Sequence, residues 1–124
     1  MSQAHFQFDQ KTPNPSMPKV EDVDPIDVFS NKDQLCLIDV RQPEEFTGPL
    51  GHIPGANLIP LGELEDKIAT LSKEKTIVFV CRSGGRSAGA TSIALDSGFE
   101  SVYNMQGGMI LWNEKEFATE GKSE

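Results

Sequence analysis

One cysteine stands at the end of a predicted strand, directly before a short loop rich in glycine and arginine. The run Thr76–Val80 is β-branched and aromatic, and it predicts a strand that ends at Cys81. Ser87–Ser97 is rich in Ala, Ser and Leu and predicts a helix that Gly98 terminates. A helix N-terminus carries unpaired N–H groups and a partial positive charge, and glycines let the preceding backbone curl around an anion. A thiolate held there is stabilised and more reactive at neutral pH, so the stretch predicts a nucleophile in an anion-binding loop.

The rest of the chain alternates predicted strands and helices. We expect further strands at Val20–Val23, Leu35–Val40, Asn57–Pro60 and Ser101–Met105, and helices at Pro25–Asn31, Leu61–Leu71 and Met109–Phe117, with a short helix near Pro43. This alternation predicts an α/β domain with a mainly parallel central sheet and helices on both sides. Ligands of such folds bind at the carboxyl ends of the strands, so we expect Asp39 and Cys81 to face the same edge of the sheet.

The two ends of the chain differ from its middle in composition. Residues 1–18 contain three prolines among polar residues and predict an extended or mobile N-terminal arm. A loosely attached tail is the favoured interpretation, while Phe6 and Phe8 leave open packing onto the domain or contact with a partner chain. Residues 19–118 are expected to form one folded domain, which a chain of 124 residues accommodates. Residues 119–124 are polar and predict a frayed C-terminal tail.

The charge balance limits the classes of partner. The net charge is −8 and the sequence pI is near 4.7, which argues against nucleic acid and anionic membranes as partners. Against this acidic background, Arg82 and Arg86 lie close together in the loop after Cys81. They indicate a site for a small anion, because the nearest charges and dipoles dominate at short range.

The remaining thiol and imidazole groups predict little chemistry of their own. Cys36 lies inside an apolar run and is interpreted as a small buried hydrophobe. Counting alone allows a disulfide between Cys36 and Cys81, but two reduced thiols are favoured because no secretory signal precedes them. The two cysteines and the two histidines make no metal-ligand pattern, so we expect no metal and no cofactor. Without a signal peptide or a membrane-spanning stretch, a cytoplasmic location is the expectation.

Four segments of the sequence resemble one family in order and in register. They are Leu37-Ile38-Asp39-Val40-Arg41 with Pro43-Glu44-Glu45-Phe46, then Gly51-His52-Ile53-Pro54-Gly55-Ala56, then Val78-Phe79-Val80-Cys81-Arg82-Ser83-Gly84-Gly85-Arg86-Ser87, and finally Val102-Tyr103-Asn104-Met105-Gln106-Gly107-Gly108 followed by Trp112. On these segments, which span roughly residues 20–117, the chain resembles a single-domain rhodanese of the thiosulfate sulfurtransferase family. The resemblance implies the rhodanese-like three-layer α/β domain, with a mainly parallel central sheet flanked by helices.

The resemblance also implies a reaction and the residues that carry it. The Cys81 thiolate would attack the outer sulfur of thiosulfate, sulfite would leave, and the resulting persulfide would pass its sulfur to cyanide or a thiol acceptor. The substrate-binding cradle would be formed by the loop backbone and its side chains, namely Arg82, Ser83, Gly84, Gly85 and Arg86. A persulfide anion needs the N–H donors and positive charge that such a loop supplies. Asp39 and Arg41 are expected to give structural support by pairing at a strand end.

Two other function classes stay open beside the sulfurtransferase. A sulfur carrier or regulatory binding module would hold the persulfide for a partner protein without turning over small acceptors. A small phosphatase or arsenate reductase is disfavoured, because the loop counts six residues from Cys81 to Arg86. Cysteine phosphatases and related arsenate reductases, as families, have one more residue between these positions, which lets the loop wrap a tetrahedral phosphate.

Several side chains near the loop have two interpretations each. Arg86 either points its guanidinium at the substrate or braces the loop by pairing with a carboxylate, while Arg82 is expected to project into solvent. Ser83 and Ser87 either donate to the sulfur or cap the next helix, and for Ser87 the cap is favoured. His52 is interpreted as part of a loop that shapes the fold rather than as a general base.

Overall fold

A computed structural model describes residues 6–122 of the chain. In this part, one sheet has the strand order β1-β2-β6-β5-β3-β4, and every neighbouring pair is parallel except β1 with β2. The strands are β1 (Thr12–Pro13), β2 (Glu21–Val23), β3 (Leu35–Asp39), β4 (Asn57–Leu58), β5 (Thr76–Val80) and β6 (Val102–Met105). The helices are α1 (Pro25–Ser30), α2 (Pro43–Phe46), α3 (Leu61–Lys67), α4 (Gly85–Asp96) and α5 (Gly108–Glu114). The predicted mainly parallel α/β sheet is confirmed.

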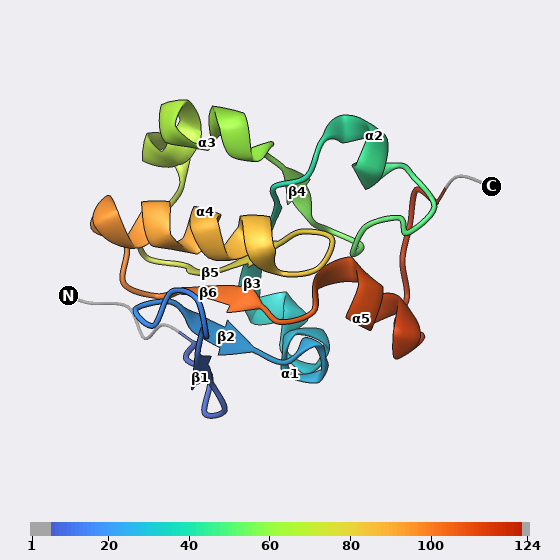
Figure 1. Cartoon of the computed structure of the whole chain (residues 1–124), viewed down its shortest axis with the longest axis horizontal. Helices are drawn as coiled ribbons and strands as arrows, with labels where there is room; N and C mark the ends of the chain where they lie inside the picture. The colour runs from blue at the N-terminus through green and yellow to red at the C-terminus, as the bar shows by residue number, and fades with distance from the viewer. Residues whose placement is uncertain (1–5, 123–124) are drawn as a thin grey trace.

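Helices cover both faces of the sheet, so the domain has three layers (Figure 1). The central strand β5 shows how the layers form, because its side chains alternate between two apolar clusters. Ile77 and Phe79 pack with residues of α3 and α4, whereas Val78 and Val80 pack with residues of α1 and α5. All of β5 is buried, as expected for a strand between β3 and β6 in a parallel sheet. In the described residues, no helix is long and apolar enough to cross a membrane.

Local signals in the sequence explain where the helices begin and end. Asp24 caps α1 by accepting the N–H of Ile26 at 3.0 Å, and Pro25 is the first helical residue, as predicted. Gly98, with φ +94°, follows the end of α4. The start of α4 differs from the prediction by two residues, because Gly84 at φ +107° turns the chain and accepts the N–H of Ala88.

The N-terminal arm is extended and packs on the domain. Its strand β1 pairs antiparallel with β2, which adds an edge strand that the sequence did not predict. Phe8 is 3% exposed, and its ring meets that of Tyr103 edge-to-face at 4.9 Å between centroids. The arm from Phe6 onward therefore corresponds to the packed alternative rather than to the favoured loose tail, because Phe8 gains an apolar site that a free tail lacks.

The C-terminal segment is also attached, at one point beyond the predicted domain boundary. His52 and Glu120 exchange backbone hydrogen bonds, with N···O distances of 3.0 and 2.9 Å. Glu120 belongs to the segment 119–124 that was predicted to fray, and this bridge attaches it to the domain. Together with the packed arm, this means that the folded unit extends beyond residues 19–118 on both sides. The predictions for residues 1–5 and 123–124 lie outside the described residues.

Candidate active site

Cys81 follows the last residue of β5, at the carboxyl edge of the parallel sheet. Its Sγ accepts the backbone N–H of Gly84 at 3.1 Å, and the Oγ of Ser87 lies 3.3 Å away. The loop is short, because α4 begins at Gly85, and it turns back on itself at Gly84. The sulfur therefore lies against the N-terminus of a twelve-residue helix, where N–H donors and the helix dipole favour negative charge.

The N-terminus of α5 packs against the loop that follows Cys81 and donates hydrogen bonds to it. Met109 donates its backbone N–H to the carbonyl of Cys81 at 2.9 Å, and Ile110 donates to that of Arg82 at 3.0 Å. This approach requires glycine at position 108, because a Cβ there would lie 2.5 Å from both carbonyl oxygens and the backbone has φ +56°. The sequence predicted turn geometry for Gly107–Gly108, but it gave no sign that Gly108 fits directly under the cysteine loop.

Arg86 pairs with a carboxylate from α2. Its two terminal nitrogens donate to the two carboxylate oxygens of Glu45 at 2.7 and 2.8 Å. This hydrogen bond from Arg86 lowers the pKa of Glu45 to about 2, and Glu45 in turn raises the pKa of Arg86. Of the two interpretations of Arg86, pairing with a carboxylate is the arrangement seen, although its side chain is still 38% exposed. Glu45 was part of a matched segment, but nothing in the sequence linked it to Arg86.

Asp39 and Arg41 form a buried ion pair at the end of β3. Arg41 donates from Nε to one carboxylate oxygen of Asp39 at 2.8 Å and from Nη2 to the other at 2.7 Å. Arg41 also donates to the carbonyl of Gly51 at 2.7 Å, so the pair ties the strand end to the following loop. Both side chains are 1% exposed. The expected pairing at the strand end is therefore present, and the structural support of the site by this pair stays a prediction.

Ser87 does not cap α4, so the favoured interpretation of this residue is wrong. It is the third residue of the helix, is fully buried, and donates to Oδ1 of Asn104 on β6, while Gly84 occupies the N-cap. Asn104 in turn donates Nδ2 to Asp22 on β2 at 2.9 Å. Nothing in the sequence linked Asn104 or Asp22 to Cys81. The available signal was Asn104 itself, which lies between Tyr103 and Met105 in a predicted strand, where a buried polar side chain needs a partner.

The geometry can now be compared with known proteins. The family profile described as a Rhodanese-like domain matches residues 24–115. The chain belongs to this family. The rhodanese-like assignment made from the four sequence segments is thus confirmed, and the match includes Cys81 and its whole loop, whereas the arm and Asp22 precede it.

Several relatives of this rhodanese-like domain have names that refer to sulfur transfer. The chain is 44% identical to "Putative sulfurtransferase YtwF" of Bacillus subtilis, over 64% of this chain and 75% of that one. It is 32% identical to "Thiosulfate sulfurtransferase GlpE" of Pseudoalteromonas translucida, over 66% and 76%. It is also 39% identical to "Putative sulfur carrier protein YrkF" of Bacillus subtilis, over 67% of this chain but only 44% of that one. Sulfur transfer in general is what these names share.

Solved structures agree with the fold, and coverage limits what can be carried over. A rhodanese-related protein from Thermoplasma volcanium superposes with a TM-score of 0.73 and 28% identity, over 78% of this chain and 94% of that one. Among other curated relatives the chain spans 61% of one Bacillus subtilis protein and 20% of a mycobacterial adenylyltransferase/sulfurtransferase. The activities, substrates and partners of those longer proteins are therefore matters for proposal.

The rhodanese-like domain holds His52 in a structural setting. Its ring stacks on Phe46 at 3.6 Å between centroids, Nδ1 lies 2.7 Å from the Phe46 carbonyl, and Nε2 lies 3.1 Å from the Glu120 carboxylate. These partners join the 46–52 loop to the C-terminal segment, in agreement with a loop-shaping role.

Both cysteines of the rhodanese-like domain are free thiols. Cys81 is 1% exposed, whereas Cys36 is half-buried on β3, where burial raises the pKa of its thiol. Within residues 6–122, no group of three or more His, Cys, Asp or Glu side chains is arranged to hold a metal ion.

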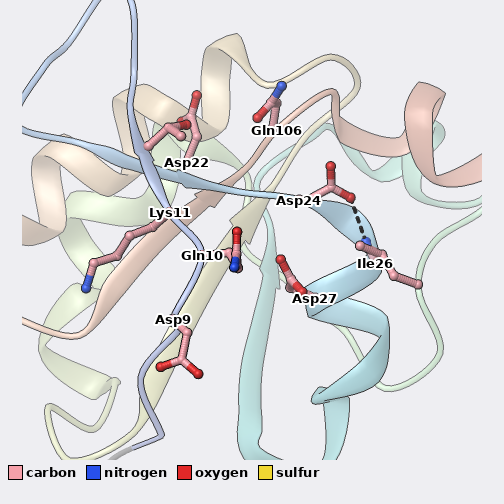
Figure 2. Close-up of a pocket in the computed structure, with 9 residues that line it drawn as sticks. Asp9, Gln10, Lys11, Asp22, Asp24, Ile26, Asp27 and Gln106 are labelled. Carbon is pink, nitrogen blue, oxygen red and sulfur yellow. Dashed lines mark hydrogen bonds between the residues drawn. The ribbon is translucent and has the colours of Figure 1, made fainter.

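Two of the cavities beside the N-terminal arm share Asp22 in their lining. One, of about 390 Å³, has one wall from the arm and another from the cysteine loop, with Met17, Ser83, Gly84 and Gln106 among its lining residues. The other, of about 640 Å³, is acidic and is shown in Figure 2 with Asp9, Asp22, Asp24 and Asp27. Asp22 lines both cavities, so one acidic side chain links the acidic cavity to the one beside the cysteine loop.

Proposed function

We propose that this protein is a sulfurtransferase that moves a sulfane sulfur from thiosulfate, or a similar anionic donor, to cyanide or a thiol acceptor through a persulfide on Cys81. The observation that carries the proposal is the position of Sγ, which accepts the Gly84 N–H at 3.1 Å and lies against the N-terminus of α4. A sulfur anion at this position is stabilised by backbone donors that need no rearrangement. The names of the relatives support sulfur transfer as the class of reaction.

The first half-reaction forms the persulfide. The Cys81 thiolate attacks the outer sulfur of thiosulfate, a new S–S bond forms, and the S–S bond of thiosulfate breaks so that sulfite leaves with the bonding electron pair. The charge then resides on the outer sulfur of the persulfide. In the second half-reaction the acceptor attacks that outer sulfur, and Cys81 leaves as a thiolate, ready for the next cycle.

Access to the sulfur selects small donors and acceptors. Cys81 is 1% exposed, so only a donor with a small reacting end can bring its outer sulfur to Sγ. Arg82 is exposed and Arg86 is partly exposed, so both are proposed to attract and bind the anionic donor. The loop residues Ser83, Gly84 and Gly85 are proposed to contribute backbone donors. We place the reaction in the cytoplasm, where thiol acceptors are kept reduced.

A sulfur carrier is the second candidate, because one relative has a name of that class. A carrier would form the same Cys81 persulfide but would release the sulfur only to a partner protein. Steady-state assays separate the two candidates. The sulfurtransferase produces thiocyanate and sulfite from thiosulfate and cyanide with multiple turnovers, whereas the carrier stops after one sulfur per chain.

The decisive variants are Cys81→Ser and, as a matched control, Cys36→Ser. We expect Cys81→Ser to abolish thiocyanate production and Cys36→Ser to retain it, because Cys36 is on β3, away from the loop. Full activity in Cys81→Ser would overturn the proposal. Hydrolysis of phosphate esters by the wild type, without thiocyanate production, would favour the phosphatase class instead.

A further inference from the structure

A chain of side-chain hydrogen bonds links Asn14 of the N-terminal arm through Asp22, Asn104 and Ser87 to Cys81. Oδ1 of Asn14 accepts the backbone N–H groups of Ser16 at 2.9 Å and Met17 at 3.1 Å. Its amide nitrogen therefore faces the other way, and Nδ2 donates to Oδ1 of Asp22 at 3.0 Å. The orientation of this amide follows from its backbone partners, because only the oxygen can accept both N–H groups.

Asp22 determines how the side-chain amide of Asn104 is oriented. An ionised carboxylate can only accept, so the side chain of Asn104 must present its nitrogen to Asp22, and Nδ2 donates to Oδ1 at 2.9 Å. The amide oxygen of Asn104 is then turned toward Ser87. Asp22 is 6% exposed and Asn104 is 1% exposed, so water does not compete freely for these contacts.

Ser87 has one hydroxyl proton and two neighbours. It lies within hydrogen-bond distance of Oδ1 of Asn104 and 3.3 Å from Sγ of Cys81. Because the Asn104 oxygen can only accept, the Ser87 hydroxyl donates its single proton to Asn104. The hydroxyl then presents lone pairs to the sulfur, and it can accept from a Cys81 S–H but cannot donate to a thiolate.

We propose that Asp22 and Asn104 are positioning residues for Cys81, which hold the Ser87 hydroxyl as an acceptor toward the sulfur and thereby favour the uncharged form of Sγ. This chain of hydrogen bonds consists of residues other than those assigned to the reaction so far, apart from Cys81. It includes Asn14 and Asp22, which precede the segment matched to the family. Through it, these two residues influence the protonation of Cys81. It acts through Ser87 without touching the substrate.

The consequence for sulfur transfer rests on the proposed function. In a persulfide the inner sulfur is uncharged and the outer sulfur carries the charge. A hydroxyl that disfavours charge on Sγ therefore favours the persulfide over the thiolate, while the loop N–H groups stabilise the outer sulfur. The domain would thus retain sulfur after the first half-reaction rather than return to the free thiolate.

Other charged groups surround the thiol and must be kept constant in a test. Arg82 and Arg86 belong to the cysteine loop and α4, and Glu45 of α2 neutralises Arg86. At the end of β3, Asp39 and Arg41 pair with each other, and α5 brings no charged side chain in its first turn. Asp22 of β2 is the acidic group within this chain of hydrogen bonds. Its replacement by Asn therefore removes a charge and also removes the requirement that Asn104 donate to it.

The test measures the pH profile of Cys81 alkylation by iodoacetamide in the full chain, with Cys36→Ser as the background. In Asp22→Asn the new amide accepts from Asn14 and can donate to Asn104, so the Asn104 amide can reverse and release the Ser87 proton to the sulfur. We expect the midpoint of the profile to fall by about one pH unit. Asn104→Ala, which keeps the Asp22 charge, is expected to shift the midpoint in the same direction.

Two controls separate the hydroxyl from simple charge. In a Ser87→Ala background, Asp22→Asn is expected to cause no shift, because there is no hydroxyl to redirect. Asp24 lines the acidic cavity that Asp22 also lines (Figure 2). Asp24→Asn removes this charge while the asparagine can still cap α1, and it is expected to leave the midpoint unchanged. An equal shift with and without Ser87, an equal shift in Asp24→Asn, or no shift in Asp22→Asn would overturn the proposal. The resting thiol is measured without any sulfur donor, so these results are independent of whether the protein transfers sulfur.

Discussion

Arg86 at the start of α4 and Glu45 on α2 form a bidentate ion pair, with N···O distances of 2.7 and 2.8 Å. The pair links the cysteine loop to an element 41 residues away in the sequence. It also neutralises one of the two arginines that follow Cys81. Whatever Arg86 contributes to anion binding is therefore reduced by Glu45, and this balance can be tested.

Replacing Glu45 by Gln should separate bracing from neutralisation. With the carboxylate gone, Arg86 adds a full positive charge to the loop, and we expect KM for thiosulfate to fall roughly two- to fivefold with kcat little changed. Thermal unfolding should show a loss of about 1 kcal/mol, since the pair is partly exposed. The control is Glu44→Gln, which removes an exposed charge from the same helix. A rise in KM specific to Glu45→Gln would mean that Glu45 orients Arg86 for binding.

The same pair predicts a pH dependence of stability. The pKa of Glu45 is lowered from 4.5 to about 2, chiefly by the hydrogen bond from Arg86. A carboxylate with a lowered pKa in the folded state stabilises fully above pH 4.5, and this contribution is lost as pH falls toward about 2. We expect the wild type to lose about 1 kcal/mol more than Glu45→Gln across that window, after allowing for solvent screening. Equal losses in denaturant titrations of the two proteins would contradict this expectation.

Gly108→Ala tests the contact between α5 and the cysteine loop. A Cβ would meet the carbonyl oxygens of Cys81 and Arg82 at 2.5 Å, and the backbone conformation disfavours any side chain. We expect a loss of about 3 kcal/mol of stability and a larger relative loss of sulfurtransferase activity, because the loop must shift. Gly62→Ala on α3 is the control, since nothing lies within 4 Å of its added Cβ. If Gly108→Ala kept wild-type activity, the loop would not depend on this packing.

Arg41→Lys tests the buried support at the end of β3. Lysine keeps the charge but cannot donate to both Asp39 oxygens and the Gly51 carbonyl in the same geometry. Leaving these buried groups incompletely paired should cost about 3 kcal/mol in the free energy of unfolding. Lys67→Ala breaks the exposed Glu63–Lys67 pair and should change stability by only about 0.5 kcal/mol. Comparable effects of the two variants in urea unfolding would show that the buried pair has no special role.

The strength of the sequence prediction varied with the range of the interactions. The strand Thr76–Val80, the position of Cys81 at its end and the family were predictable, because hydrophobic period, glycine content and motif order are local signals. The attachment of Phe8 was not, since it depends on a site made by Tyr103 on a distant strand. Glu45 and Asn104 were missed for the same reason, because each meets its partner across at least 17 residues of sequence. The Ser87 prediction failed because Gly84 took the cap position and freed the hydroxyl to face the sulfur.

The central claim is that Cys81 carries the transferred sulfur. Intact-mass and peptide mass spectrometry after incubation with thiosulfate test it most directly, together with titration of the sulfite released. The account predicts one added sulfur per chain on the Cys81 peptide, equimolar sulfite, and removal of that sulfur by cyanide. A sulfur adduct on Cys36 instead, or no adduct with wild-type protein that is folded and reduced, would contradict it.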